Sequence, residues 1–251
     1  QKAFLHFFLN KLKYIIKGSV GVQPKPVLGK IFEYYRIKFM GLYHKKYFLS
    51  FDLDNLRGIK YIYYPLHKQP ELMNNSQAIL WHDQRHTISY ISSILPSGYK
   101  LFVREHRLNW GRRYTKYLKC ISSLPGVKLV NPFDSQFKYI QNADLIITDN
   151  GTTGWEGLLH NKTVITLDRT FYETTELPIN VSRASELNKH IIVALNEYNS
   201  FSGKEYDQRL GLFVDSERET TLSEKDFSPV DNLLMIEKLL TLRTKTQNSK
   251  N

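Results

Sequence analysis

The sequence has little cysteine and no long apolar run, and both features narrow the class of protein. Cys120 is the only cysteine, so no disulfide can form within the chain, which is typical of a reducing compartment. No apolar run approaches the roughly 20 residues that cross a bilayer, and no signal peptide is evident. We therefore expect a cytoplasmic protein. Its first residue is Gln1 rather than Met, which suggests a piece of a longer protein.

Acidic residues are also scarce, but only in one part of the chain. The 251 residues include 35 Lys and Arg and 24 Asp and Glu, a net charge of +11. Residues 1–60 contain 12 of the basic residues and only Glu33, Asp52 and Asp54, a net charge of +9. Dense positive charge binds nucleic acids, anionic lipids or acidic polysaccharides. Since neither a recognition-helix motif nor an RNA-binding aromatic strand occurs, we expect no nucleic-acid partner.

Residues 1–59 form a basic, aromatic segment that we expect to be largely helical. Its first apolar residues recur at near-helical spacing with lysines between them: Phe4, Phe8, Leu12, Ile15 and Ile16. Such a basic amphipathic helix can lie on an anionic membrane, here the inner face. The equal alternative is that its apolar stripe packs against another domain. Residues 31–51 are expected to begin as a helix and then become irregular.

From residue 60 onward, short apolar runs alternate with amphipathic stretches. We expect strands at 61–66, 100–104, 127–130, 144–148 and 163–167. Helices are expected at 77–95, 113–123, 135–142, 153–160, 185–198, 204–213 and 229–243. This alternation predicts βαβ units and an α/β fold, a Rossmann-like parallel sheet with helices on both faces. We assign residues 60–244 to this domain and 245–251 to a polar tail.

In such a sheet, ligands bind at the carboxyl ends of the strands. The most specific candidate follows the strand at 144–148 and reads DNGTTGWE, from Asp149 to Glu156. A turn rich in glycine and hydroxyls before a helix N-terminus can hold a phosphate; the residues in question are Asn150, Gly151, Thr152, Thr153 and Gly154. Glu156 can accept hydrogen bonds from ribose hydroxyls or a base. The alternative is a tight turn in which Thr152 or Thr153 caps the helix.

Two further candidates follow the first two strands of the domain. His67 and Glu71 lie in PLHKQPE, where two prolines make a rigid loop that can position polar groups; the alternative is a surface turn. Arg104, Glu105 and His106 end the second strand. His106 can donate to a phosphate or exchange a proton near neutral pH, and Arg104 can neutralise charge on a leaving group.

Two other chemistries have little support. His82 and His86 are four residues apart in HDQRH, as in the helical pair of some zinc proteases. The following acidic residue is Asp83 instead of glutamate and no third ligand is evident, so we expect the start of a helix and no zinc site. No G-x-S-x-G turn occurs, so hydrolase chemistry of that kind is not expected.

Taken together, several segments resemble the capsule and surface polysaccharide biosynthesis family, which includes β-Kdo transferases that use CMP-Kdo. They are PLHKQPE, LPSGYKLFVREH, LPGVKLVNP, ADLIITDNGTTGWEGLL and NKTVITL. The resemblance covers residues 60–171 and depends on the order and spacing of three motifs. His67 and Glu71 match the first motif, Glu105 and His106 the second, and Gly151, Thr152, Gly154 and Glu156 the third.

The sequence also departs from the family pattern. Arg104 stands where the family has lysine, Arg107 where it has proline, and Gly157 where it has alanine. The first change keeps the charge, the second adds a cation to a looser loop, and the third places a poorer helix former. These departures put the identity of the sugar in doubt more than the binding of a nucleotide-sugar.

The resemblance implies the donor-binding, C-terminal half of a GT-B glycosyltransferase. Such a half would help to transfer a sugar from a nucleotide-sugar, for example Kdo from CMP-Kdo, to a glycan or glycolipid acceptor. Glu105 and His106 would be catalytic, and the other motif residues would bind the donor. No metal or other cofactor is required, because cationic side chains and a helix N-terminus can hold the phosphate. The alternatives are a GT-B-like sugar-nucleotide epimerase and a non-catalytic module that binds polysaccharide or a partner.

Overall fold

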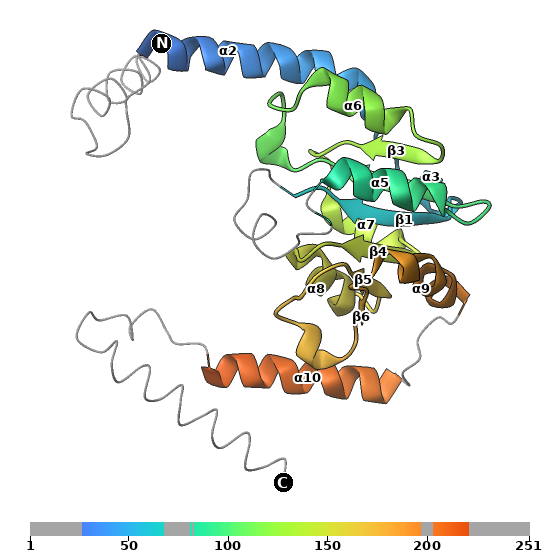
Figure 1. The fold of residues 1–251 in the computed structure, drawn as a ribbon. Coiled ribbons are helices and arrows are strands. Elements are labelled where there is room, and N and C mark those ends of the chain that lie inside the picture. Colours follow the sequence, from blue (N-terminus) through green and yellow to red (C-terminus); the bar gives the residue numbers. More distant parts are fainter. Residues whose placement is uncertain (1–26, 68–80, 82, 197–202, 221–251) are drawn as a thin grey trace, which may run out of the picture.

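A six-stranded, all-parallel sheet forms the centre of the protein, as a computed structural model shows for residues 27–67, 81, 83–196 and 203–220 (Figure 1). In sequence order its strands are β1 (Tyr61–Pro65), β2 (Lys100–Arg104), β3 (Val127–Val130), β4 (Leu145–Thr148), β5 (Val164–Thr166) and β6 (Ile179–Asn180). Their order across the sheet is β3-β2-β1-β4-β5-β6. The expected α/β, Rossmann-like class is therefore confirmed.

Most helices fall close to the ranges that the sequence predicts; the exceptions are the helix at 53–57, for which no range was predicted, and the last described helix, which runs to 220 instead of 213. The helices are α2 (Val27–His44), α3 (Leu53–Arg57), α5 (Gln84–Ser93), α6 (Thr115–Ser122), α7 (Gln136–Asn142), α8 (Thr152–Leu159), α9 (Ala184–Asn196) and α10 (Gly203–Thr220), with short 3-10 turns η1 (Lys45–Tyr47), η3 (Arg107–Asn109) and η4 (Glu173–Thr175). The five predicted strands are confirmed to within one residue at each end. The two-residue strand β6 was not predicted, because it is too short to show a pattern. The helices expected at 4–17 and 229–243 lie outside the described residues, as does the start of the one expected at 77–95.

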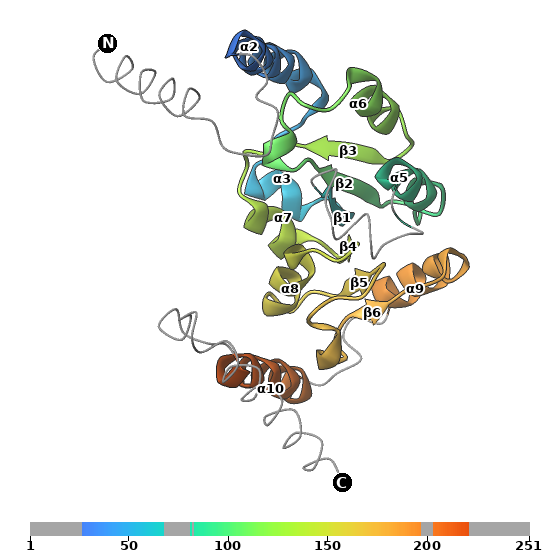
Figure 2. The ribbon, with the colours of Figure 1, turned by 60° about the vertical axis from the view of Figure 1, so that its left-hand side comes forward.

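Three layers build the domain (Figure 2). Helices α5, α6 and α9 cover one face of the sheet around a core that includes Tyr64 and Val103. Helices α3, α7 and α8 cover the other face around Tyr63 and Phe102. Every residue of β1 and β4 is buried, as expected for a parallel sheet that is covered on both sides. Consecutive strand residues therefore point into different layers.

Part of the basic N-terminal segment joins this domain. Helix α2 lies beyond the β3 edge of the sheet, whereas α10 lies beyond its other edge (Figures 1 and 2). Leu49 forms a parallel bridge with Val130 beside β3, and Leu56 of α3 is fully buried in the core under α7 and α8. Within the described residues, no helix combines the length and the apolar character that a membrane span requires.

The strand order places a topological switch point between β1 and β4. From β1 the chain continues outward through β2 and β3, and it then returns to β4 on the other side of β1. The crossovers leave β1 and β4 in opposite directions, which is the arrangement beside which parallel sheets bind ligands at their carboxyl edge. The loops after β1, β2 and β4 carry all three groups of candidate residues.

Candidate functional site

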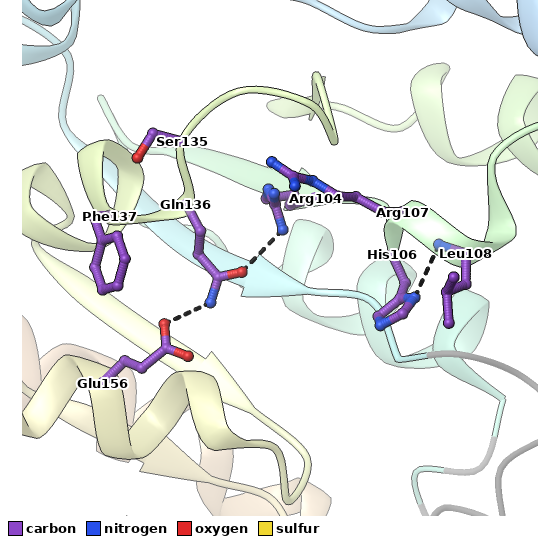
Figure 3. A pocket seen from close by; sticks show the side chains of 8 residues that line it. All are labelled: Arg104, His106, Arg107, Leu108, Ser135, Gln136, Phe137 and Glu156. Atoms are coloured by element: carbon purple, nitrogen blue, oxygen red, sulfur yellow. Dashed lines mark hydrogen bonds between the residues drawn. The ribbon is translucent and has the colours of Figure 1, made fainter.

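A pocket of about 560 Å³ opens at the carboxyl edge of the sheet. Its walls come from the loop after β2, from the start of α7 and from α8: Arg104, His106, Arg107, Leu108, Ser135, Gln136, Phe137 and Glu156 (Figure 3). The volume is within the usual range for a small-molecule site. The pocket brings together Arg104, His106 and Glu156, which belong to two separate sequence motifs.

Gln136 connects two of these residues across the floor of the pocket (Figure 3). Its side-chain oxygen accepts a hydrogen bond from Arg104 Nη1 at 2.9 Å, and its Nε2 donates to Glu156 Oε2 at 2.7 Å. The same Nε2 lies 3.1 Å from Thr153 Oγ1. The amide thus fixes the Glu156 carboxylate through one oxygen, and the other accepts no hydrogen bond from the described residues.

Two arginines supply positive charge on one wall. Arg104 is 8% exposed, and its Nη2 donates to the carbonyl oxygen of Pro132 at 2.7 Å. Arg107 donates from Nε to the same carbonyl at 2.9 Å and from Nη2 to Phe133 O at 3.3 Å. These backbone contacts hold both guanidinium groups in place without neutralising their charge. The pocket wall therefore carries two cations and one anion, Glu156.

His106 has a defined tautomer when it is neutral. Its Nδ1 accepts a hydrogen bond from the backbone N–H of Leu108 at 3.2 Å (Figure 3). An amide nitrogen can only donate, so Nδ1 must carry the lone pair and the ring proton must sit on Nε2. Neutral His106 is therefore a hydrogen-bond donor through Nε2, and it lies across the pocket from Glu156.

Glu105 lies away from the pocket, in a buried ion pair. It is 2% exposed, and its Oε2 accepts a hydrogen bond from Arg113 Nε. Its Oε1 accepts from the backbone N–H of His106 at 2.8 Å. Arg113 also donates to the carbonyl oxygen of His67 at 3.1 Å. In this setting Glu105 can orient the two histidine loops, and a direct part in catalysis stays a prediction.

His67 packs against the glycine-rich turn. A Cβ atom on Gly151 would lie only 2.5 Å from Cε1 of His67, so the imidazole needs a glycine there. Its Nε2 is buried and has no hydrogen-bond partner within the described part of the chain. Burial, aided by repulsion from His106, lowers the pKa of His67 to about 4. His67 is therefore neutral at pH 7 and lies between the turn and His106.

Asp149 is the acidic neighbour of His67. Its Oδ2 lies 4.0 Å from His67 Nε2, and its Oδ1 accepts a hydrogen bond from Tyr64 Oη at 2.8 Å. Gln84 approaches the same carboxylate at 3.5 Å. Burial raises the pKa of Asp149 to about 6. A carboxyl group with this pKa can hold or release a proton near neutral pH.

The glycine-rich turn leads into α8 without a side-chain cap. Gly151 is the N-cap residue, and among the described residues no side chain caps the first turn of the helix. The alternative in which Thr152 or Thr153 caps the helix is therefore wrong: Thr152 is already inside the helix, and the Thr153 hydroxyl contacts Gln136. Asn150 Nδ2 is buried without a partner among the described residues. Uncapped backbone N–H groups at this end favour a bound anion.

Two expected residues lie outside the described residues: Glu71 of the first motif and His82 of the histidine pair. No group of three or more His, Cys, Asp or Glu within the described ranges could hold a metal ion.

The pocket also contains residues that sequence reasoning missed. Gln136 belongs to none of the three motifs. It does follow the carboxyl end of β3, and residues in that position of a parallel sheet commonly bind ligands. Arg107 was noted only as a departure from the family pattern.

Comparisons with known proteins give structural matches of low identity and no sequence match. Neither a protein-family model nor a curated protein sequence matches the chain. Among solved structures, the UDP-GlcNAc 2-epimerase of Methanocaldococcus jannaschii has 20% identity and a TM-score of 0.44, covering 71% of this chain and 50% of that one. The β-Kdo 2,7 transferase KpsC of Thermosulfurimonas dismutans has 15% identity and a TM-score of 0.41, covering 71% and 67%.

The β-Kdo 2,4 transferase of the same KpsC has 17% identity and a TM-score of 0.40, covering 51% of this chain and 40% of that one. The chain thus spans between 40% and 67% of the length of these three structures. Identities of 20% or less concern the fold and carry no assignment of function.

Proposed function

We propose that the pocket binds the nucleotide part of a nucleotide-sugar and that the chain takes part in glycosyl transfer. The observation that carries this proposal is the polarity of the pocket across its length. The Nε2 donor of His106 lies toward one end and the carboxylate of Glu156 lies at the other, with the guanidinium groups of Arg104 and Arg107 together on the wall between them (Figure 3). A nucleoside phosphate has the matching polarity, an anion at one end and hydroxyl donors at the other.

At the phosphate end, protein side chains would supply the positive charge that attracts the phosphate. His106 would donate from Nε2 to a phosphate oxygen, and the fixed guanidinium of Arg107 would add Coulombic stabilisation. The uncapped N-terminus of α8 adds the positive end of a helix dipole on the same edge. Arg104 would add a second guanidinium to this wall, where its Nη1 is hydrogen-bonded to Gln136.

At the nucleoside end, Glu156 would accept hydrogen bonds from the ribose hydroxyls. Gln136 already holds one carboxylate oxygen, so little rotamer entropy is lost when a sugar binds. Leu108 and Phe137, which are 60% and 53% exposed, give the pocket apolar surface that a base can cover. The donor-binding roles of His67, Glu71 and Asn150 remain proposals beside this core.

In the transfer step, the bond between the anomeric carbon and the phosphate oxygen would break and its electron pair would move to the nucleotide. The acceptor oxygen would bond to the anomeric carbon, and the proton of the acceptor hydroxyl would pass to the departing nucleotide phosphate or to water. The pocket residues would stabilise the charge that develops on the leaving phosphate, which is the term expected to dominate such a reaction. CMP-Kdo is the proposed donor, on the resemblance of the three motifs, and a glycan or glycolipid is the proposed acceptor.

A thermal-shift panel of CMP, CDP, UDP and GDP tests the binding proposal. A nucleotide at 100 times its Kd stabilises the folded state by about 2.7 kcal/mol, which raises the Tm by roughly 5–10 °C for a chain of this size. CMP should give the largest rise, and His106→Ala should remove most of it. His86→Ala is the matched control, because the His86 side chain is 87% exposed. No stabilisation by any nucleotide would contradict the proposal.

A sugar-nucleotide epimerase is the second candidate, and one observation favours it. Epimerisation needs an acid and a base at the sugar, and His67 with Asp149 forms a buried pair of that kind beside the glycine-rich turn. This candidate predicts that UDP takes the place of CMP in the panel and that a UDP-sugar is converted without any acceptor. Incubation of UDP-GlcNAc with the chain, followed by separation of the epimers, distinguishes the two candidates.

A further inference from the structure

Helix α2 has two faces of different character. The inward face packs on the loop between β2 and α6. Gly111 has a φ of +70° and lies directly against the backbone of Ile37, so a side chain at position 111 would meet the helix. His44 Nε2 lies 3.0 Å from Thr115 Oγ1, and Arg112 pairs with Glu33 at 3.5 Å. The loop that bears the pocket residues His106 and Arg107 is thus attached to α2.

The outward face of α2 is apolar and exposed. Its residues follow a helical spacing of three and four, and they are Phe32, Tyr35, Phe39, Leu42 and Tyr43. Phe32, Phe39 and Leu42 are 72%, 69% and 75% exposed. Singly exposed apolar side chains are common on proteins, but an aligned series on one helix marks an interaction surface. We refer to these five residues as the α2 outer face.

Basic side chains border the α2 outer face. Residues 27–47 contain five Lys and Arg and one acidic residue, Glu33, a net charge of +4. Lys46 Nζ lies 3.9 Å from the centre of the Tyr43 ring, and Lys38 Nζ lies 5.2 Å from that of Tyr34. The ammonium groups therefore lie against aromatic rings in cation–π contacts, so positive charge borders the apolar face, the combination by which amphipathic helices bind lipid headgroups.

We propose that the α2 outer face binds an anionic lipid bilayer. Charge complementarity selects this partner over a second copy of the chain, because two copies of residues 27–47, each with a net charge of +4, repel each other. It is also preferred over a nucleic acid, since Phe32, Phe39 and Leu42 form an apolar ridge suited to insertion among acyl chains. The proposal does not depend on the function proposed above. It implies that the pocket is held close to the membrane, within reach of a lipid-linked acceptor.

Sedimentation of the full chain with vesicles tests this proposal. We expect binding to vesicles of phosphatidylcholine with phosphatidylglycerol, weak binding to phosphatidylcholine alone, and a decrease with added salt. The variant Phe32→Ser/Phe39→Ser/Leu42→Ser should bind at least about tenfold more weakly. Arg36→Glu/Lys38→Glu should do the same through charge. Leu212→Ser is the matched control, because Leu212 is 63% exposed on α10, beyond the opposite edge of the sheet.

Each outcome decides for or against the α2 outer face. An unchanged Tm in all three variants shows that weaker vesicle binding is not caused by unfolding. Wild-type binding that both α2 variants retain would place the membrane contact in another segment and overturn the proposal. The proposal is equally overturned if the chain binds no vesicles and instead self-associates through this face, or binds RNA through it.

Discussion

Two polar clusters lie side by side at the carboxyl edge of the sheet. They differ in whether their ionisable side chains are buried or line a pocket. The pocket cluster faces the α7 and α8 side and consists of Arg104, His106, Arg107, Gln136 and Glu156. The buried cluster faces the α5 and α6 side and consists of Tyr64, His67, Gln84, Glu105, Arg113 and Asp149. In the buried cluster Glu105 forms an ion pair with Arg113, and burial shifts the pKa values of His67 and Asp149. In the pocket, Arg104 and Arg107 donate only to uncharged oxygens among the described residues.

The difference between the two clusters arises because successive side chains of a strand point to opposite faces of the sheet. Arg104 and Glu105 are consecutive at the end of β2, where extended backbone sends neighbouring side chains to opposite faces of the sheet. Arg104 therefore joins the layer of Phe102, and Glu105 joins the layer of Val103. Residues adjacent in a motif can thus serve a structural and a binding role separately. We infer that the buried cluster positions the loops whose outer residues line the pocket.

The largest expected effect comes from removing the arginine of the buried cluster. Arg113→Ala leaves Glu105 buried without its cation, so the free energy of unfolding should fall by about 3–5 kcal/mol. Chemical denaturation measures this change. The adjacent Arg112 is a matched control, because it is 54% exposed and pairs with Glu33 at the surface; Arg112→Ala should cost no more than about 1 kcal/mol. Equal losses in the two variants would show that the buried pair of Glu105 and Arg113 stabilises the fold no more than a surface pair does.

A second effect concerns pH. Between pH 4 and 6.5 the unfolded chain protonates His67 while the folded chain does not, so this residue makes stability rise with pH. Between pH 3.8 and 6 the folded chain retains a proton on Asp149 that the unfolded chain has lost, so this residue makes stability fall with pH. In the wild type, the two contributions largely cancel over this window.

Asp149→Asn removes only the second contribution and keeps an oxygen that can accept from Tyr64. The free energy of unfolding of this variant should therefore rise by about 3 kcal/mol from pH 4 to 6.5, relative to the wild-type profile. His67→Gln should give the opposite slope. Urea unfolding at a series of pH values checks both. Profiles parallel to the wild type would show that neither group titrates differently in the folded state.

The smallest expected effect concerns the contact between His67 and the glycine-rich turn. Gly151→Ala forces a Cβ against the imidazole, so it should destabilise the fold by about 1–3 kcal/mol. Gly58→Ala is the matched control, because no atom lies within 4 Å of the added Cβ and φ is −92°; its effect should stay within about 0.5 kcal/mol.

The double variant Gly151→Ala/His67→Ala isolates this contact. Without the imidazole the added methyl group has room, so the effect of Gly151→Ala should largely disappear in the His67→Ala background. If the two changes are additive, the packing of His67 against the turn does not decide the stability of this part of the edge.

Much of the fold could be predicted because parallel strands are continuous apolar runs. Residues 100–104 and 127–130 were located at both ends, since polar or glycine residues border them. The turn before α8 could be predicted because its glycines and threonines are typical of a turn that leads into a helix. By contrast, β6 has two residues and no pattern. The pairing of residue 49 with residue 130 is a long-range contact that no local signal records.

The candidate site was predicted in outline, but its connections were not. The sequence indicated His106 and Glu156, which line one pocket. Gln136, which joins Glu156 to Arg104, has no chemistry of its own that would single it out. The partner of Glu105 is an arginine eight residues further on, across a loop whose course the sequence does not specify. Grouping Glu105 with His106 by adjacency overlooked the alternation of side chains at the strand end.

A calorimetric titration of the preferred nucleotide into wild type, His106→Ala and Glu156→Gln examines the pocket itself. Because both residues are proposed to bond the ligand, each variant should raise the Kd at least about tenfold, the loss expected for a hydrogen bond to a charged group. Glu186→Gln is the matched control, because Glu186 of α9 is exposed and pairs only at the surface with Arg183. This variant should leave the Kd unchanged. Wild-type affinity in both pocket variants would contradict a nucleotide held between His106 and Glu156.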